Sequence, residues 1–125
     1  MLSPTRGRRQ TNDDLIAWQL SYELQREVYA LTAGGPAARD FKFRDQIRDS
    51  SASASRNIAE GFARFRPKEL ARFLEIARGS LTETHHLRDG RDRGYFAAAD
   101  HARLSLLAGR AAIATTRLLR HLRSC

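Results

Sequence analysis

The sequence predicts an all-α protein built as an antiparallel up-down-up-down four-helix bundle. Along four successive segments, apolar residues recur at spacings of three and four, the period of a helix with one buried face. Only three prolines and few β-branched residues are present, which argues against a fold rich in strands. The connections between the segments are short, and short connections make successive helices antiparallel neighbours.

The composition is that of one globular domain. The chain has 125 residues, of which 42% are hydrophobic, so it can bury a core and is too apolar for intrinsic disorder. No apolar run approaches the roughly 20 residues that a membrane-spanning helix needs, so no membrane partner is expected. The only cysteine is Cys125, which excludes an internal disulfide framework and a thiolate zinc site, and we expect a cytoplasmic protein.

Residues 1–12 are predicted to form a flexible basic tail, and residues 13–125 the bundle. The tail contains Arg6, Arg8 and Arg9 and has no periodic apolar pattern. Because no apolar stretch follows these arginines, a secretory signal is not expected.

The first helix is predicted over residues 13–32. Asn12 or Thr11 is expected to cap it, and two aspartates follow where the helix dipole favours negative charge. The stretch 32–36, with two glycines and a proline, is expected to end the helix. Its apolar stripe consists of Leu15, Trp18, Tyr22, Leu24, Val28 and Leu31.

The second helix is predicted from residue 42 to residue 64. Its middle, residues 50–55, contains only serine and alanine, and serine is a weak helix former. Two interpretations stay open: a closely packed neighbouring helix that needs small side chains, or a flexible linker. The expected inward stripe is Ile47, Ser51, Ala54, Ile58 and Phe62.

The third helix is predicted over 67–93, with Pro67 at its first position and Gly94 at its end. Asp100 is expected to cap the fourth helix. The expected stripe of the third helix is Leu70, Phe73, Leu74, Ala77, Leu81, Thr84 and Leu87. The expected stripe of the fourth helix is Leu104, Leu107, Ala111, Ala114, Leu118 and Leu122.

Basic side chains are concentrated on the fourth helix. The net charge is +8, and all basic residues other than Lys42 and Lys68 are arginine. No acidic residue follows Asp100 in the sequence. The resulting arginine stripe, of which the first three members are seven residues apart, is Arg103, Arg110, Arg117, Arg120 and Arg123.

Three interpretations of the arginine stripe stay open. Its last members complement the negative end of the helix dipole. Alternatively, the stripe pairs with Glu23 and Glu27 of the first helix, in the same or another subunit. The functional interpretation is contact with the phosphates of RNA or DNA. No motif that reads bases is present, so such binding would depend on shape and charge.

The sequence gives no support for catalysis, a metal or a cofactor. Glu83 and His86 form a Glu-x-x-His pair, but helical di-iron sites need a second such pair and further carboxylates, which this chain lacks. His85 and His86, if both are helical, point about 100° apart and would not share one ion. We therefore expect no catalytic residue, no metal ligand and no enzymatic activity.

Polar residues interrupt the facing sides of the second and third helices. Such groups inside a bundle commonly fix register or oligomeric state, and we prefer this structural role to a ligand site. The set is Asn57, Glu60, Gly61, Arg64, Gly79, Ser80 and Glu83.

Several of these residues carry a family resemblance, which covers about residues 13–95. The matching strings are Gln46-Ile47-Arg48, Ser53, Asn57-Ile58-Ala59-Glu60-Gly61, Arg64, Phe73-Leu74-Glu75-Ile76-Ala77-Arg78-Gly79-Ser80-Leu81 and Glu83. They resemble the four helix bundle protein family, related to proteins encoded in intervening sequences of bacterial 23S ribosomal RNA genes and labelled S23-like. The chain is also similar to the accessory variability determinant protein of diversity-generating retroelements.

The resemblance implies a cytoplasmic bundle that assembles into a ring-like homopentamer. It also implies a basic surface that binds nucleic acid and a protein partner such as a reverse transcriptase. Asp49 stands where a basic residue is common in the family, which leaves the fourth helix and the tail to carry that surface.

The function predicted from the sequence is therefore that of a non-enzymatic homo-oligomeric bundle, a nucleic-acid-binding or accessory scaffold that uses an arginine surface. The alternative is a protein–protein interaction module with no nucleic-acid role.

Overall fold

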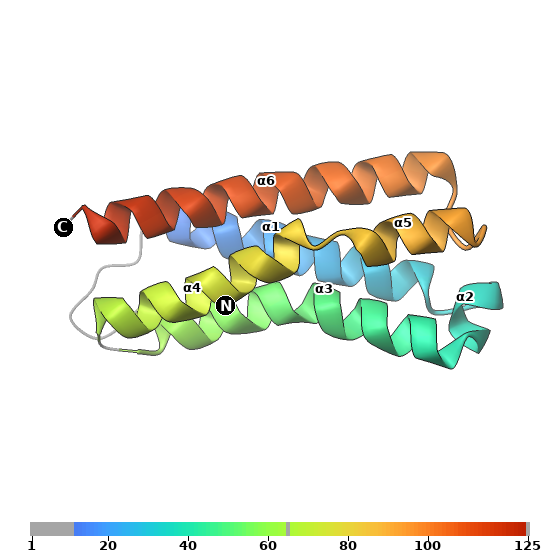
Figure 1. Ribbon diagram of the computed structural model, residues 1–125, viewed down its shortest axis with the longest axis horizontal. Coiled ribbons are helices and arrows are strands. Elements are labelled where there is room, and N and C mark those ends of the chain that lie inside the picture. Colours follow the sequence, from blue (N-terminus) through green and yellow to red (C-terminus); the bar gives the residue numbers. More distant parts are fainter. Residues whose placement is uncertain (1–11, 65, 125) are drawn as a thin grey trace.

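The computed structural model describes residues 12–64 and 66–124, and these ranges form six helices and no strand (Figure 1). The predicted all-α class is therefore confirmed for this part of the chain. Apart from Asn12, which begins the first helix, the predicted flexible tail lies outside the described residues. The helices are α1 (Asn12–Leu31), α2 (Gly35–Arg39), α3 (Phe41–Phe62), α4 (Pro67–Thr82), α5 (His85–Asp92) and α6 (Ala98–Arg123).

The long helices lie side by side along the longest axis of the molecule (Figure 1). α1 packs against α3 and α6, and α4 packs against the same two helices. α5 follows α4 and contacts α3 and α6, while the short α2 contacts α3. No helix in the described ranges is long and apolar enough to cross a bilayer.

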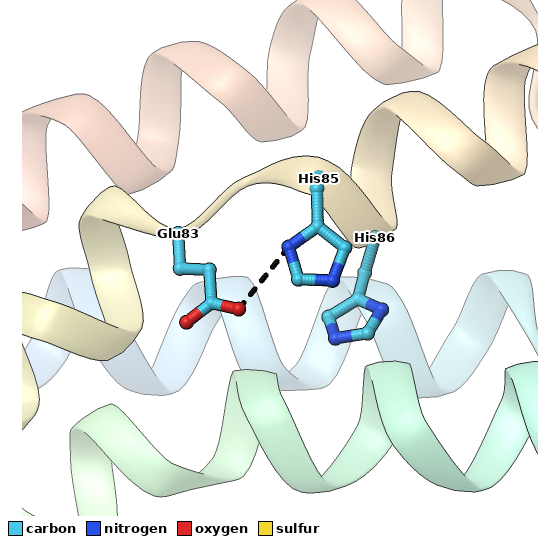
Figure 2. A group of neighbouring side chains, drawn as sticks. All are labelled: Glu83, His85 and His86. Carbon is cyan, nitrogen blue, oxygen red and sulfur yellow. Dashed lines mark ion pairs between the residues drawn. The ribbon is translucent and has the colours of Figure 1, made fainter.

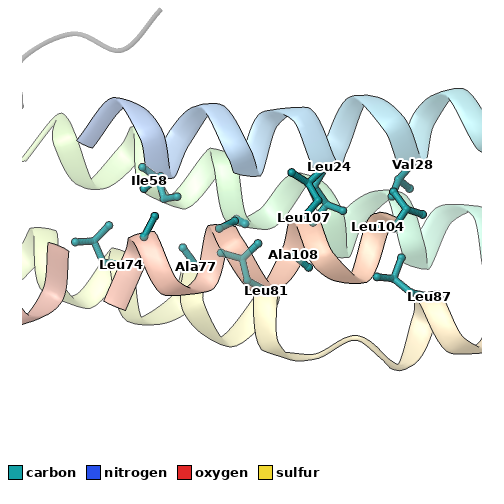
Figure 3. Packing of buried hydrophobic residues seen from close by; sticks show 14 of the residues in the cluster. Leu24, Val28, Ile58, Leu74, Ala77, Leu81, Leu87, Leu104, Leu107 and Ala108 are labelled. Carbon is teal, nitrogen blue, oxygen red and sulfur yellow. The ribbon is translucent and has the colours of Figure 1, made fainter. Parts of the chain in front are cut away.

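A single apolar cluster fills the space between these helices (Figure 3). Ile58 of α3, Leu74 of α4 and Leu104 of α6 are all completely buried. Burial of one such side chain contributes about 1.5–3 kcal/mol. Tyr22 departs from the predicted stripe, because it is exposed and its ring stacks on Trp18 at 5.0 Å.

α3 is continuous through the serine and alanine run, so the flexible-linker interpretation was wrong. Asp40 caps the helix, because its side chain accepts a hydrogen bond from the Phe43 N–H at 3.2 Å. Within this run, Ser53 accepts a hydrogen bond from Ser80 of α4 at 3.0 Å. Ser55 is buried and donates to the Gln25 side chain of α1 at 2.6 Å. All five residues of the predicted stripe are buried: Ile47, Ser51, Ala54, Ile58 and Phe62.

The connection between α3 and α4 brings the two helices close together at Gly61. A Cβ atom at Gly61 would lie 2.9 Å from Leu70 Cδ1 and 3.0 Å from Phe73 Cβ. A larger residue at this position would require Leu70 and Phe73 to move. Pro67 occupies the first position of α4, as predicted.

The predicted third helix is interrupted. α4 ends at Thr82 and α5 begins at His85, with non-helical backbone at Glu83 (φ −87°, ψ 89°) between them. The Thr82 hydroxyl donates to the carbonyls of Arg78 and Gly79, at 3.1 and 3.2 Å, and so competes for acceptors in the last turn. The prediction of one helix over 67–93 was therefore wrong.

Two smaller expectations also differ from the structure. Ala97, with extended backbone, is the residue that precedes α6, so Asp100 lies inside the first turn and does not cap it. The connection after α1 contains the short α2, which the sequence did not predict. Gly35 begins α2 with φ 68°, a conformation that favours glycine.

Candidate functional site

The structure divides the arginine stripe of α6 into paired and unpaired members. Arg103 Nε lies 2.6 Å from Glu27 Oε1, and Arg103 Nη1 lies 3.0 Å from Asp100 Oδ1. These hydrogen bonds, that to Glu27 first, raise the pKa of Arg103. Pairing of the stripe with α1, one of the three interpretations of the sequence, therefore holds for Arg103.

The other end of the stripe is paired with α4. Arg123 Nη2 lies 2.7 Å from Glu75 Oε2, and the same carboxylate also pairs with Arg78. The hydrogen bond from Arg123 lowers the pKa of Glu75, and the two arginine charges lower it further against the effect of burial. Arg103 and Arg123 thus have local partners at both ends of α6.

The remaining members, Arg110, Arg117 and Arg120, are exposed and form no ion pair within the described residues. Two large apolar side chains are exposed on the same helix: Leu106 is 66% exposed and Ile113 is 56% exposed. Because Leu106, Arg110, Ile113 and Arg117 follow at three- and four-residue spacing, they share one side of α6. This side is therefore both basic and apolar.

The seven residues of the predicted polar set do not form one cluster. Asn57 and Ser80 both bond to Ser53: Asn57 Nδ2 donates to the Ser53 carbonyl at 2.8 Å, and the Ser80 hydroxyl donates to Ser53 Oγ at 3.0 Å. The second of these bonds joins α3 to α4. The sequence did not place Ser53 in this set, although it lies one turn before Asn57.

Three of the other members lie near the α3–α4 connection. Glu60 and Arg64 form an exposed ion pair at 2.6 Å, and the Arg64 guanidinium lies over the Phe73 ring at 5.1 Å. Gly61 provides the close approach described above. Gly79 is exposed, and a Cβ atom there would meet nothing within 4 Å.

Glu83, the seventh member, lies at a polar pocket between α3 and the α4–α5 junction. The pocket is open and has a volume of about 370 Å³. It is lined by Gln46, Asp49, Ser50, Ser53, Ser80, Glu83, His85 and His86.

Three of these side chains meet at the junction, as Figure 2 shows. Glu83, His85 and His86 each offer one ligand atom, and the three atoms lie within 4.8 Å of one another. His85 Nδ1 lies 3.2 Å from Glu83 Oε1, and the ring centroids of the two histidines are 3.9 Å apart. Partial burial lowers the pKa of His86, as does the neighbouring His85, which favours its neutral form.

The expectation that the His85 and His86 rings diverge was wrong: both residues are in α5, but their side-chain torsions bring the ring centroids to 3.9 Å from each other. Both rings extend toward α3 from the first turn of α5 (Figure 2). The sequence does contain a signal for the break between α4 and α5. Four residues of low helix propensity stand shortly before the two histidines: Gly79, Ser80, Thr82 and Thr84.

Comparison with known proteins identifies the family. The 23S rRNA-intervening sequence protein family matches residues 13–112. No curated protein matches the chain at a significant level. The family match includes the polar pocket and ends within α6, between Arg110 and Arg117. Because it covers most of the sequence, the chain belongs to the 23S rRNA-intervening sequence protein family.

Proposed function

We propose that this protein is a non-enzymatic, homo-oligomeric scaffold of the cytoplasm, an antiparallel four-helix bundle that binds nucleic acid through arginines of α6. The observation that carries this proposal is the exposure of Arg110, Arg117 and Arg120 without an ion pair in the described ranges. Arginines without acidic partners are free to displace counterions from phosphates.

The paired arginines contribute less to this surface. Arg103 and Arg123 would have to leave Glu27 and Glu75 in order to contact a phosphate. Residues 110–120 extend for about 15 Å along the helix, at 1.5 Å per residue. Duplex DNA carries on the order of nine phosphate charges over that length. Three arginines on one helix therefore match a polyphosphate better than a single small anion.

A structured RNA is the first ligand to test, with duplex DNA second, because both present the closely spaced phosphates that the exposed arginines would contact. Binding should be measured across a salt series, with the mass of the protein determined by light scattering. The expected result is a steep fall in affinity with salt. In the triple variant R110Q/R117Q/R120Q, the log–log slope should fall by about 2 to 3, since each lost contact removes about 0.7–0.9.

A matched control removes the same charge elsewhere. Arg39, Arg56 and Arg88 are exposed on α2, α3 and α5, so R39Q/R56Q/R88Q lowers the net charge equally. The control variant should keep the wild-type slope. If both triple variants lose the same slope, the effect is one of net charge, and α6 is not the interface.

The second candidate is a protein–protein interaction module with no nucleic-acid role, and exposed Leu106 and Ile113 favour it. Exposed apolar side chains in a cluster mark interaction surfaces. Their occupant would be another subunit of a homo-oligomer, a homopentamer on the family resemblance, or a partner such as a reverse transcriptase. L106S/I113S should then reduce the mass in light scattering. No binding to either nucleic acid at low salt, from an intact oligomer, would favour this second candidate.

A further inference from the structure

We propose that Glu83, His85 and His86 form a binding site for a divalent late transition-metal ion, with Zn²⁺ as the representative ion, at the junction of α4 and α5 (Figure 2). The site is separate from the arginine surface of α6, and the proposal does not depend on nucleic-acid binding.

The distances between the ligand atoms are close to those that a metal ion needs. Zinc binds nitrogen and oxygen ligands at about 2.0–2.2 Å, so two ligands of a tetrahedral site lie about 3.4 Å apart. His85 Nδ1 and Glu83 Oε1 are already 3.2 Å apart. The three ligand atoms spread over at most 4.8 Å, so a small rotation of His86 relative to the other two completes the set. The Glu83 and His85 side chains are 64% and 49% exposed, which leaves them free to adjust.

The ligand chemistry selects the class of metal. Two imidazoles and one carboxylate suit zinc, copper, nickel and iron, whereas magnesium and calcium prefer oxygen ligands alone. Three protein ligands leave a further coordination position for water, as in zinc sites that are not purely structural.

The polar pocket provides room for that water. It opens beside the three ligands and has a volume of about 370 Å³. Asp49 of α3 lines the pocket and adds a negative charge, while Ser53 and Ser80 add hydroxyl groups. A water on a bound ion would therefore have hydrogen-bond acceptors in the same pocket, and such partners around the ligands tune many metal sites.

The break in the helix is what makes the site possible. In a continuous helix, Glu83 and His85 are two residues apart and would point to nearly opposite sides. Here Glu83 is the residue that ends α4, and His85 and His86 are the first two residues of α5. A bound ion would therefore connect the two helices across the junction and stabilise their relative orientation.

The first test uses wild-type protein without a histidine tag, after treatment with a chelator. Zn²⁺ is added while the ring signals of all four histidines are followed by NMR. The signals of His85 and His86 should shift and saturate at one ion per chain. His101 and His121 lie on α6 and serve as internal controls, so their signals should not move. Equal shifts at all four histidines, or none, would overturn the proposal without any need for a variant.

The second test measures Zn²⁺ affinity by calorimetry. E83Q, H85Q and H86Q should each bind at least ten-fold more weakly than wild type, while H101Q should bind equally. Zn²⁺ should also raise Tm for wild type and H101Q but not for the H85Q/H86Q double variant. Mg²⁺ should neither bind measurably nor raise the Tm of any variant. Far-UV circular dichroism checks the helix content of each variant. Undiminished Zn²⁺ affinity in folded H85Q/H86Q would overturn the site.

Discussion

The interface of α3 with α4 and α5 has two halves of opposite character. Toward the α3–α4 connection the interface is apolar, and we call this part the dry half. Ile58 and Leu74 are completely buried there, and Gly61 lets the helices approach closely. Toward the α4–α5 junction the same interface opens into the polar pocket, where Ser53 and Ser80 share a hydrogen bond.

The difference shows how one pair of helices can combine stability with a site. In the dry half, completely buried apolar side chains and the close approach at Gly61 hold the helices together. In the polar half, small residues on α3 and the break after Thr82 leave a space lined by hydroxyl, carboxylate and imidazole groups. The dry half should therefore dominate the free energy of unfolding, and the polar half should tolerate substitution.

Leu74→Ala should give the largest effect. Leu74 is 0% exposed, so its truncation removes apolar burial and leaves a cavity. Substitutions of this kind lower the free energy of unfolding by about 2–5 kcal/mol. Urea unfolding followed by circular dichroism measures the change. Ser80→Ala, in the polar half, is the matched control, and its free energy of unfolding should fall much less. Equal losses would mean that the two halves contribute equally to stability.

Gly61→Ala should give the second largest effect. The added Cβ would lie 2.9 Å from Leu70 Cδ1 and 3.0 Å from Phe73 Cβ, so the Leu70 side chain must rotate and Phe73 must move by a few tenths of an ångström. Crowding of a packed site by one methyl group lowers the free energy of unfolding by about 1–3 kcal/mol. The same urea experiment applies. An unchanged unfolding midpoint would show that the side chains around Gly61 can rearrange to accept a methyl group without loss of stability.

Acid should weaken the end of the molecule opposite the α3–α4 connection, where Asp40 caps α3. Asp40 Oδ2 accepts a hydrogen bond from the Tyr95 hydroxyl at 2.7 Å, and Oδ1 accepts one from the Phe43 N–H. These bonds, that to Tyr95 first, lower the pKa of Asp40 below its ordinary value of 3.8. The charged carboxylate therefore stabilises the fold fully above that value, and this stabilisation is lost as the pH falls through the lowered pKa.

The prediction is tested with Asp40→Asn, which keeps a side chain able to cap α3 and removes the charge. At neutral pH, wild type should unfold at higher urea than the variant. The difference should shrink as the pH falls below 4, the region in which an ordinary aspartate takes up its proton. A difference that stays constant from neutral to acid pH would contradict a role for the Asp40 charge.

The sequence predicted the dry half well because periodicity reports burial. Ile58, Leu70 and Leu74 are all buried, as their spacing predicted. The same periodicity concealed the break between α4 and α5. Leu81 and Leu87 are buried on either side of it, with Thr84 half-way, so a helical spacing continues through backbone that is not helical.

The pairs formed by α6 were only partly predictable. Glu27 was a candidate partner of the arginine stripe, and Arg103 does pair with it. The pairing of Arg123 with Glu75 joins residues 48 apart in the sequence, and nothing local indicates it. Charge patterns identify a basic helix, but the packing of helices decides which arginines remain free.

Gly79→Ala should give the smallest effect, and one of opposite sign. Gly79 lies within α4 on an exposed surface, and its added Cβ would meet nothing within 4 Å. Replacement of a helical glycine by alanine removes its entropic penalty and should raise the free energy of unfolding by about 0.5–1 kcal/mol. Urea unfolding and light scattering should be measured together. A loss of stability with a lower mass would mean that another subunit covers this face of α4, and Gly79 would then share with Gly61 the role of admitting a close neighbour.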